Sequence, residues 1–457
     1  MEQYENYKDS GIEYIGRIPK HWEVKRIKYI GFLYGGLSGK SSIHFNQISH
    51  SNNKTFIPFT NICNNKIIDP NQLQFVVIES GEKQNKVQQG DLFFMMSSEN
   101  FDDVGKSSIL LNDLKETYLN SFCKGFRITN DGYSPSFINY LLLSKPYRSI
   151  VLTEANGYTR INLKIDKIND IPIIFPTQID EQVAIADFLD RKTAEIDKII
   201  ANKQKLIALY EEEKQAIINQ AVTKGLDPNV NMKDSGVEWL GEIPEHWEVK
   251  KLKYIKAPIK NSFVDGPFGS NLKTEHFIQN GDVYVIDSGF ITSGNFEFNR
   301  DLKTISLEHF ETVSRSECNV SDIIIAKIGA NFGMSGILPK LDKRSLVSGN
   351  TFKLTIDKAL FNINFIHKQL LCLKWAGEID LLVKGSAQPA LSMGPMSDLC
   401  FAIPESIEEQ ILIVEHIENE FFRLDLIIEK FNKQIELMQE YKTTLISEVV
   451  TGKVKVN

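Results

Sequence analysis

Apolar residues near the end of the chain recur at alternating steps of three and four positions, with charged residues between them. This spacing places apolar side chains along one side of a helix and is typical of a helix that packs along a second helix. The apolar positions are Val414, Ile417, Phe421, Leu424, Ile428, Phe431, Ile435 and Met438, and after Lys442 they continue at Leu445 and Val449. The pattern therefore predicts a long helix over 407–457.

A weaker copy of this pattern lies 228 positions earlier. It is interrupted by Lys203 and Lys214, and its apolar positions are Leu189, Ile196, Ile200, Ile207, Tyr210 and Ile217. A long apolar seam must be buried, and the nearest partner for each helix is the other one. We therefore expect the helices to pair as an antiparallel coiled coil. The alternative is that each helix lies on its own domain.

A second repeat frames the segments that the helices separate. The stretch DSGIEYIGRIPKHWEVK at 9–25 returns as DSGVEWLGEIPEHWEVK at 234–250. A repeat of this length indicates two copies of one unit. Each segment also carries strand-like runs, at 91–96 and 322–327, bounded by turn residues.

One helix is plausible in each segment, at 136–143 and 364–373. The predicted fold class is therefore α+β, with two similar domains joined and spaced by two long antiparallel coiled-coil helices and an internal pseudo-twofold. The predicted boundaries are 1–178 for the first domain, 179–226 for the first helix, 227–406 for the second domain and 407–457 for the second helix.

The 457-residue chain has a net charge of −7, which argues against nucleic-acid binding until it is divided. The stretch 180–225 holds nine acidic and seven basic residues, and 407–452 holds ten and four, so the helices carry −8 and the remainder carries +1. Overall charge is therefore a weak guide to partners. The five cysteines are widely spaced, which favours the cytoplasm and argues against a zinc site.

Catalytic motifs are not found. The run Gly39-Lys40-Ser41 lacks the glycine that a phosphate-binding loop needs five residues before Gly39, where Tyr34 stands. His21 and His246 recur beside tryptophan and near proline, so a packing or turn role is favoured for both.

Polar, glycine-containing loops are better candidates for recognition than for reaction, because glycines let backbone amides approach phosphate and polar side chains can bond base edges. They form three pairs, at 35–42 and 266–273, at 97–106 and 327–335, and at 157–163 and 385–391. The alternative is that they are ordinary solvated turns. The candidate DNA-binding residues are Ser38, Lys40, Ser41, Ser97, Asn100, Lys106, Tyr158, Arg160, Ser270, Asn271, Lys273, Lys327, Asn331, Ser386 and Gln388.

The chain resembles the specificity subunit of type I restriction–modification enzymes over essentially its whole length. The resemblance rests on the doubled GxIPxHWEVK stretch, on Pro-x-x-[IL]-x-Glu-Gln before each long helix, on DGPFGSNLK at 265–273 and on IIIAKIGA at 323–330. The first domain departs from this pattern, because GLSGKSS stands where the second domain has DGPFGSNLK.

This resemblance implies two target-recognition domains that each read half of an asymmetric, interrupted DNA sequence, with the coiled coil as spacer. It implies no catalytic residue, metal or cofactor in this chain. S-adenosylmethionine, ATP and Mg would belong to partner subunits, namely methyltransferase subunits, two of them in our prediction, and an ATP-dependent translocase–nuclease. The residues expected near those partners are Glu181, Gln182, Glu409 and Gln410.

Two other functions stay open at this point. The chain could be a nuclease or methyltransferase that acts alone on DNA, or a coiled-coil scaffold that binds only proteins. The bases recognised, the length of the gap and the existence of active partners do not follow from the sequence.

Overall fold

The computed structural model describes residues 2–46, 50–157, 159–292, 294–298, 301–329, 331–383 and 390–456. They form two compact units, one made of 1–204 with 432–457 and one made of 205–431. Each unit contains part of both long helices, so the domain boundaries predicted above remain predictions. Helices and mostly antiparallel strands together make up each unit.

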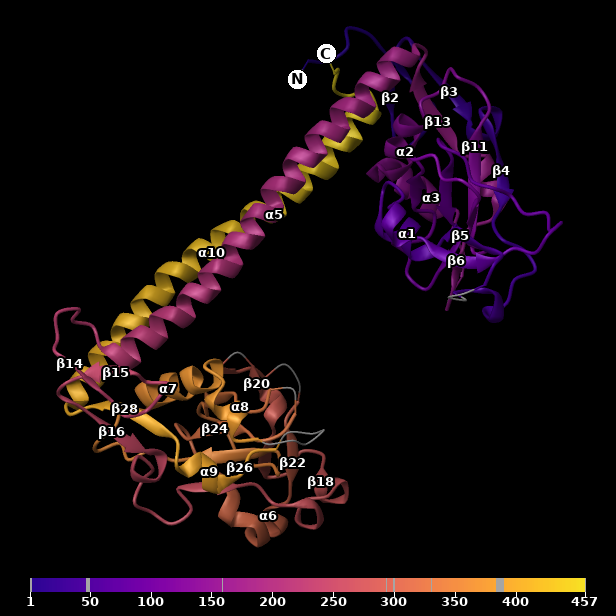
Figure 1. Ribbon diagram of the computed structural model, residues 1–457. Coiled ribbons are helices and arrows are strands. Elements are labelled where there is room, and N and C mark those ends of the chain that lie inside the picture. Colours follow the sequence, from indigo (N-terminus) through magenta and orange to yellow (C-terminus); the bar gives the residue numbers. More distant parts are fainter. Residues whose placement is uncertain are drawn as a thin grey trace. The chain divides into compact units, whose positions relative to one another are not determined.

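The first unit is built around two sheets, with short helices against them (Figure 1). One sheet has the order β4-β11-β7-β9 and the other β10-β5-β6, in which β10 and β5 are parallel. The strands are β1 (Tyr7–Asp9), β2 (Arg17–Pro19), β3 (Trp22–Arg26), β4 (Gly31–Gly35), β5 (Asn53–Ile57), β6 (Gln74–Val77), β7 (Leu92–Met95), β8 (Ser97–Ser98), β9 (Ser107–Ile109), β10 (Thr117–Leu119), β11 (Cys123–Ile128), β12 (Ile161–Asn162) and β13 (Pro172–Pro176). The helices are α1 (Phe59–Asn64), α2 (Pro135–Leu143), α3 (Lys145–Thr153), α4 (Ile165–Asn169) and the start of α5 (Ile179–Lys224).

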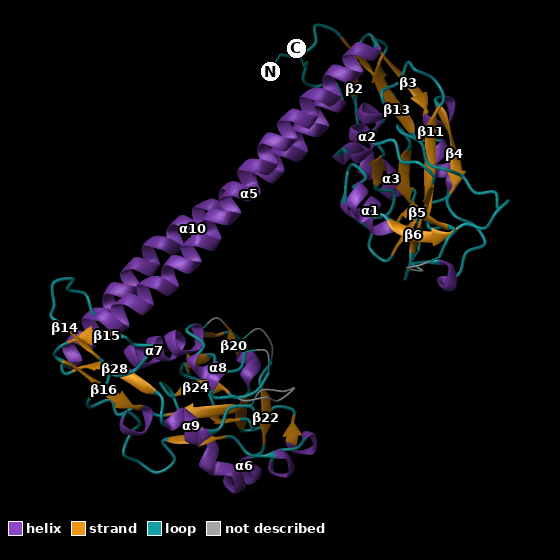
Figure 2. Cartoon of the chain, viewed as in Figure 1, coloured by secondary structure: helices purple, strands orange, loops and turns teal. Residues whose placement is uncertain are grey.

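The second unit has a related plan, with β17-β27-β24-β25 in place of the first sheet and a five-stranded sheet, β18-β22-β19-β26-β23, in place of the other. Figure 2 shows its strands and helices in separate colours. The strands are β14 (Met232–Asp234), β15 (Glu242–Pro244), β16 (Trp247–Lys251), β17 (Phe263–Asp265), β18 (Phe277–Ile278), β19 (Val283–Ile286), β20 (Ile291–Thr292), β21 (Asn295–Phe296), β22 (Lys303–Ile305), β23 (Glu317–Cys318), β24 (Ile323–Ala326), β25 (Ser335–Ile337), β26 (Arg344–Val347), β27 (Thr351–Leu354) and β28 (Cys400–Pro404). The helices are α6 (Leu307–Val313), α7 (Ile363–Trp375), α8 (Glu378–Leu381), α9 (Met393–Ser397) and the start of α10 (Ile407–Val450).

The short elements predicted from sequence are confirmed. The strand-like runs are β7 and β24, and all four residues of each strand are buried. The two helical stretches are α2 and α7. Both start at a side-chain cap, because Ser134 accepts a hydrogen bond from the Phe137 N–H, and Asn362 accepts one from the Phe365 N–H.

The long helices run antiparallel within each unit. In the first unit, Lys203 contacts Gln434 and Asp197 contacts Lys442. The residue number on α10 therefore falls as the residue number on α5 rises. In the second unit, the rings of Tyr210 and Phe431 lie 6.1 Å apart. Farther along, Lys214 pairs with Asp425. Seam residues are buried in both units, among them Ile196, Ile200, Leu424, Ile428, Leu445 and Val449.

Both helices end at a glycine in the left-handed region of backbone space. Gly225 has φ +72° and Gly452 has φ +70°, which a residue with a Cβ adopts only with strain. A Cβ on Gly225 would lie 3.4 Å from the ring of Trp247, and one on Gly452 would lie 3.3 Å from that of Trp22. The end of each helix therefore packs on a tryptophan of the 17-residue repeat.

Candidate nucleic-acid interface

The predicted recognition loops of the first unit are brought together. Strand β8 pairs antiparallel with β12, so that Ser97 lies opposite Asn162. Leu163 extends this pairing by donating its N–H to the Met96 carbonyl at 2.9 Å. The second and third predicted loops therefore form one continuous surface.

The first loop reaches that surface through a turn that sequence reasoning missed. The Leu37 N–H donates to the Leu119 carbonyl at 2.7 Å, and a Cβ on Gly36 would lie only 2.1 Å from the Asn120 oxygen. Asn120 also accepts the N–H of Phe122 at 2.9 Å through its side chain. Glycine at position 36 is thus required for the loop to approach the turn.

A cavity of about 610 Å³ opens where these segments meet. It is lined by residues that include Ser97, Phe122, Lys124, Asn162, Lys164 and Asp166. The Arg160 guanidinium lies 5.4 Å above the centre of the Phe122 ring. The Ser97 hydroxyl is buried without a hydrogen-bond partner among the described residues.

The side chain of Lys40, which was predicted to contact DNA, forms an ion pair inside the first unit. Its side chain is only 5% exposed and pairs with Glu82. The hydrogen bond from Lys40 lowers the pKa of Glu82 to about 2, with a further hydrogen bond from Gln84. The ammonium group of Lys40 therefore holds the loop in place, and contact of Lys40 with DNA stays a prediction.

The other candidates in this unit differ in how free they are. Ser38, Ser41 and Asn100 are exposed, although Ser41 hydrogen-bonds His44 and Asn100 caps its own turn. Lys106 pairs with Asp103 at 2.6 Å and remains one-third exposed. Tyr158 lies outside the described residues.

The second unit repeats this convergence around Lys327. Its ammonium lies 3.3 Å from a carboxylate oxygen of Asp265 and 4.2 Å from the centre of the Phe268 ring. Its carbonyl accepts the Leu391 N–H at 3.1 Å, which connects the end of the third loop to the other two. The Lys327 side chain is 9% exposed. Lys327 therefore joins the three loops, and its direct contact with DNA stays a prediction.

The close approach at Gly36 recurs at Gly266. A Cβ on Gly266 would lie 2.0 Å from the carbonyl oxygen of Ser348. Ser348 caps its turn by accepting the Asn350 N–H at 3.3 Å, as Asn120 does in the first unit. These turns, 120–122 and 348–350, lie 228 positions apart, so the offset that relates the helices could have revealed them.

Exposed candidates in the second unit lie beside a second cavity, of about 480 Å³, next to the 266–273 loop. Ser270, Asn271 and Lys273 are exposed, whereas Asn331 is half-buried and donates its amide to the Ile291 carbonyl at 3.0 Å. Ser386 and Gln388 lie outside the described residues.

Comparisons with known proteins agree on one family. The family model described as the type I restriction modification DNA specificity domain matches residues 19–209. The MjaVIII specificity subunit of Methanocaldococcus jannaschii, a type I restriction enzyme, is 23% identical over 96% of this chain and 94% of its own. The putative MjaX specificity subunit of the same organism is 24% identical over 99% and 97%. Residues 19–209 thus match the type I DNA specificity domain, and nearly the whole chain is similar to type I specificity subunits.

Two solved structures show a similar fold. A chain from a study of complex assembly and conformational transition of the type I R-M system has a TM-score of 0.69 at 10% identity, over 96% of this chain and 99% of that one. The HsdS subunit from Thermoanaerobacter tengcongensis has a TM-score of 0.54 at 10% identity, over 96% and 98%.

Two of the residues expected to bind partners lie inside the folded chain. Gln182 and Gln410 have no exposed surface. The Gln182 side chain accepts the Ser134 N–H at 2.9 Å, and that of Gln410 accepts the Asn362 N–H at 2.8 Å. These amides tie the start of each long helix to the cap of a shorter one. Contact of either amide with a partner subunit stays a prediction.

Glu181 and Glu409 are partly exposed but also have internal partners. Glu181 accepts the indole N–H of Trp22 at 3.1 Å and the hydroxyl of Tyr4 at 2.8 Å, and it lies 2.9 Å from His21. Burial, with the Glu181 hydrogen bond, raises the pKa of Tyr4. Glu409 makes the same contacts with Trp247 and His246. The packing role favoured for the two histidines therefore has a physical basis, as side chains that help hold each helix start.

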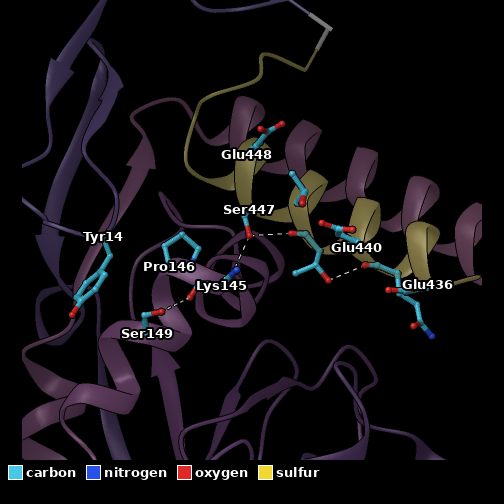
Figure 3. Close-up of a pocket in the computed structure, with 11 residues that line it drawn as sticks. Tyr14, Lys145, Pro146, Ser149, Glu436, Glu440, Ser447 and Glu448 are labelled. Carbon is cyan, nitrogen blue, oxygen red and sulfur yellow. Dashed lines mark hydrogen bonds between the residues drawn. The ribbon is translucent and has the colours of Figure 1, made fainter. Parts of the chain in front are cut away.

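A groove of about 690 Å³ in the first unit lies between the start of α3 and the last turns of α10 (Figure 3). Lys145 donates its backbone N–H to the Ser447 hydroxyl at 3.3 Å across it. Glu436, Glu440 and Glu448 also line it, so this face carries negative charge. Phosphate is repelled from such a face, which distinguishes it from the loop surfaces.

Metal-binding clusters and membrane-spanning helices are both absent from the described residues. No group of three or more His, Cys, Asp or Glu side chains there could hold a metal ion. Within the same residues, no helix is long and apolar enough to cross a membrane.

Proposed function

We propose that this specificity subunit reads an interrupted DNA sequence, with one half-site bound by the loops of each unit. The observation that carries the proposal is the repeated convergence of three loops on a capped turn, at Gly36 and Asn120 in one unit and at Gly266 and Ser348 in the other. Two surfaces with one backbone plan but different side chains suit the reading of two different sequences.

The two long helices serve in this proposal as the spacer between the half-sites. Their antiparallel contacts within each unit support a coiled coil that relates the two recognition domains by a pseudo-twofold. A spacer of this kind fixes the number of base pairs between the half-sites, because a change in helix length changes the separation by about 1.5 Å per residue.

Catalysis is assigned to partner subunits. We propose that the chain binds duplex DNA together with methyltransferase subunits, two of them, and an ATP-dependent translocase–nuclease. Those subunits supply S-adenosylmethionine, ATP and Mg, and they methylate adenine or cut the DNA. The acidic groove beside α10 is a surface for a basic protein segment rather than for DNA.

Methylation-aware sequencing of host DNA, with and without this gene, tests the proposal. The expected result is one bipartite motif that disappears with the gene. Exchanging 1–175 for the corresponding segment of a relative should alter one half of the motif, and a change in both halves would contradict independent reading. Inserting four residues within 194–204 should alter the gap alone.

Two alternatives predict different results. A stand-alone enzyme would cut or methylate DNA as a purified chain, without partners. A protein scaffold would leave the fluorescence anisotropy of labelled bipartite duplexes unchanged. The measurement is made at low and at physiological salt, because phosphate contacts weaken steeply as salt is added.

A further inference from the structure

Exposed phenylalanine rings lie on each loop surface, among them Phe101, Phe122 and Phe268. Phe122 is 53% exposed and Phe268 is 60% exposed, although both stand within the convergent loops rather than on a sheet edge. An apolar ring held in water gains nothing for the fold, since the stabilisation comes from removing apolar surface from water. Both rings are therefore available to a ligand.

A cation lies over each ring. The Arg160 guanidinium carbon is 5.4 Å from the centre of the Phe122 ring, and the Lys327 ammonium is 4.2 Å from that of Phe268. A cation over an aromatic face is attracted by the ring quadrupole, which restrains both groups. Each unit thus carries a ring and a positive charge as a pair, although the cations come from different loops.

The backbone also holds each ring in place. The Phe122 N–H donates to the Asn120 side chain, and the Phe268 carbonyl accepts the Asn271 N–H at 2.8 Å. Lys327 is in turn fixed by Asp265 at 3.3 Å. A ring that is held before its partner arrives loses little conformational entropy on binding.

The surroundings of the rings identify the class of ligand. Lys124 and Lys164 line the cavity beside Phe122, against one carboxylate from Asp166. In the second unit, Arg315 reaches Asp265 from the other side and is 60% exposed at its side chain. An apolar ring among positive charges suits a polyanion that also offers flat apolar faces, and DNA does so where an apolar side chain enters a base step and partly unstacks it.

We propose that Phe122 and Phe268 pack against a base step of the half-site that their own unit reads, with Arg160 and Lys327 beside them as the accompanying charges. This inference rests on the proposed function and adds the residues that contact each half-site.

The two units differ in their cation. Arg160 is exposed and can also bond a base or phosphate, whereas Lys327 is buried and acts only by positioning Phe268.

The test uses the full chain with its partner subunits and a duplex that carries the motif found by methylation sequencing. Phe122→Ala should weaken binding of that duplex by roughly 5- to 150-fold, as the loss of a base–aromatic contact does. Phe122→Leu should retain part of the affinity. Neither phenylalanine substitution removes a charge, so the slope of log affinity against log salt concentration should stay unchanged. Arg160→Ala removes one charge and should lower the size of that slope by about one.

Matched controls separate this effect from general surface damage. Phe75→Ala removes a ring that is 51% exposed on β6 of the same unit, and it should leave binding unchanged. Tyr254→Ala is the corresponding control for Phe268→Ala, since Tyr254 is 67% exposed. Each phenylalanine variant should relax or weaken methylation at its own half-site alone.

Three results would overturn the inference. Variants that bind and methylate as wild type while the bipartite motif persists would refute the role of the rings and leave the proposed function standing. Variants that keep DNA affinity but no longer copurify with partner subunits would show that the rings dock protein. Loss of affinity for both half-sites with one variant would show that the ring acts through the fold. Absence of any bipartite motif would refute the proposed function itself.

Discussion

Glu409 accepts the indole N–H of Trp247 at 2.9 Å, so the first turn of α10 is bonded to the repeat stretch 162 positions before it. The Trp247 ring is fully buried and also meets Phe365 edge-on, with ring centres 6.1 Å apart. A carboxylate near the start of a helix is further stabilised by the helix dipole. This bond therefore links the long helix, the repeat and α7.

We expect Glu409→Ala to lower the free energy of unfolding by about 1–3 kcal/mol, because it leaves a buried indole N–H without an acceptor. Glu409→Gln keeps an oxygen at the same place and should cost less. Urea unfolding of the full chain measures both. The control is Glu415→Ala, at an exposed position two turns along the same helix, and equal losses for Glu409→Ala and Glu415→Ala would contradict the role of the bond.

Lys214 interrupts the apolar seam of α5, and its side chain is only 13% exposed. Its ammonium reaches Asp425 of α10 and, at 3.3 Å, Glu211 of its own helix. Asp425→Ala should therefore destabilise the chain by about 1 kcal/mol, since it leaves a half-buried ammonium with a weaker partner.

The double variant Lys214→Leu/Asp425→Ala should recover that loss, because an apolar side chain fills the seam. A thermodynamic double-mutant cycle from thermal unfolding gives the coupling energy. Purely additive effects of the two substitutions would show that the pair does not act across the seam.

Gly266→Ala tests the close approach that organises the second loop surface. The added Cβ would lie 2.0 Å from the Ser348 oxygen, so one of the two backbones must move. We expect a loss of about 1–3 kcal/mol and weaker methylation at the second half-site alone. Gly394→Ala is the matched control in the same unit, because nothing lies within 4 Å of its Cβ. If the two variants behave alike, the approach of the loop to the turn does not matter.

His367 should make the stability of the second unit depend on pH. Its Nε2 lies 2.9 Å from the Ser335 carbonyl, and burial lowers its pKa from 6.5 to about 4. Between these two values the unfolded chain binds a proton that the folded chain does not, so stability falls as the pH is lowered, by about 1.4 kcal/mol per pH unit. Above pH 6.5 this contribution is fully present.

Urea unfolding between pH 4.5 and 7.5 measures that slope. His367→Gln removes the titrating group but keeps an N–H donor, and it should flatten the slope by one proton. His416→Gln, at an exposed position of the same unit, should leave it unchanged. An identical slope for wild type and His367→Gln would contradict the assignment.

The sequence was informative where a period or a repeat carried the signal. The seam residues are buried or half-buried as their spacing predicts, and α2 and α7 lie where expected. The convergence of the loops was not predictable, because it depends on β8 and β12, which have two residues each and no readable alternation.

The internal partners of charged side chains were the other feature that the sequence did not show. Lys40 and Lys327 looked like free cations because their partners, Glu82 and Asp265, are 42 and 62 positions away. Glu181 is bonded to Trp22 over an even longer separation, of 159 positions. Only the folded chain shows which polar residues are already satisfied.

The first unit is assembled from both ends of the chain, 1–204 and 432–457, whereas the second is continuous over 205–431. Domains generally fold as the ribosome releases them, starting from the N-terminus. Here 1–204 cannot complete its packing until 432–457 has been translated, because Pro19 and Trp22 lie against Gly452. The unit 205–431 can therefore finish folding before the unit that contains 1–204, and a chain that ends before 432 leaves the first unit incomplete.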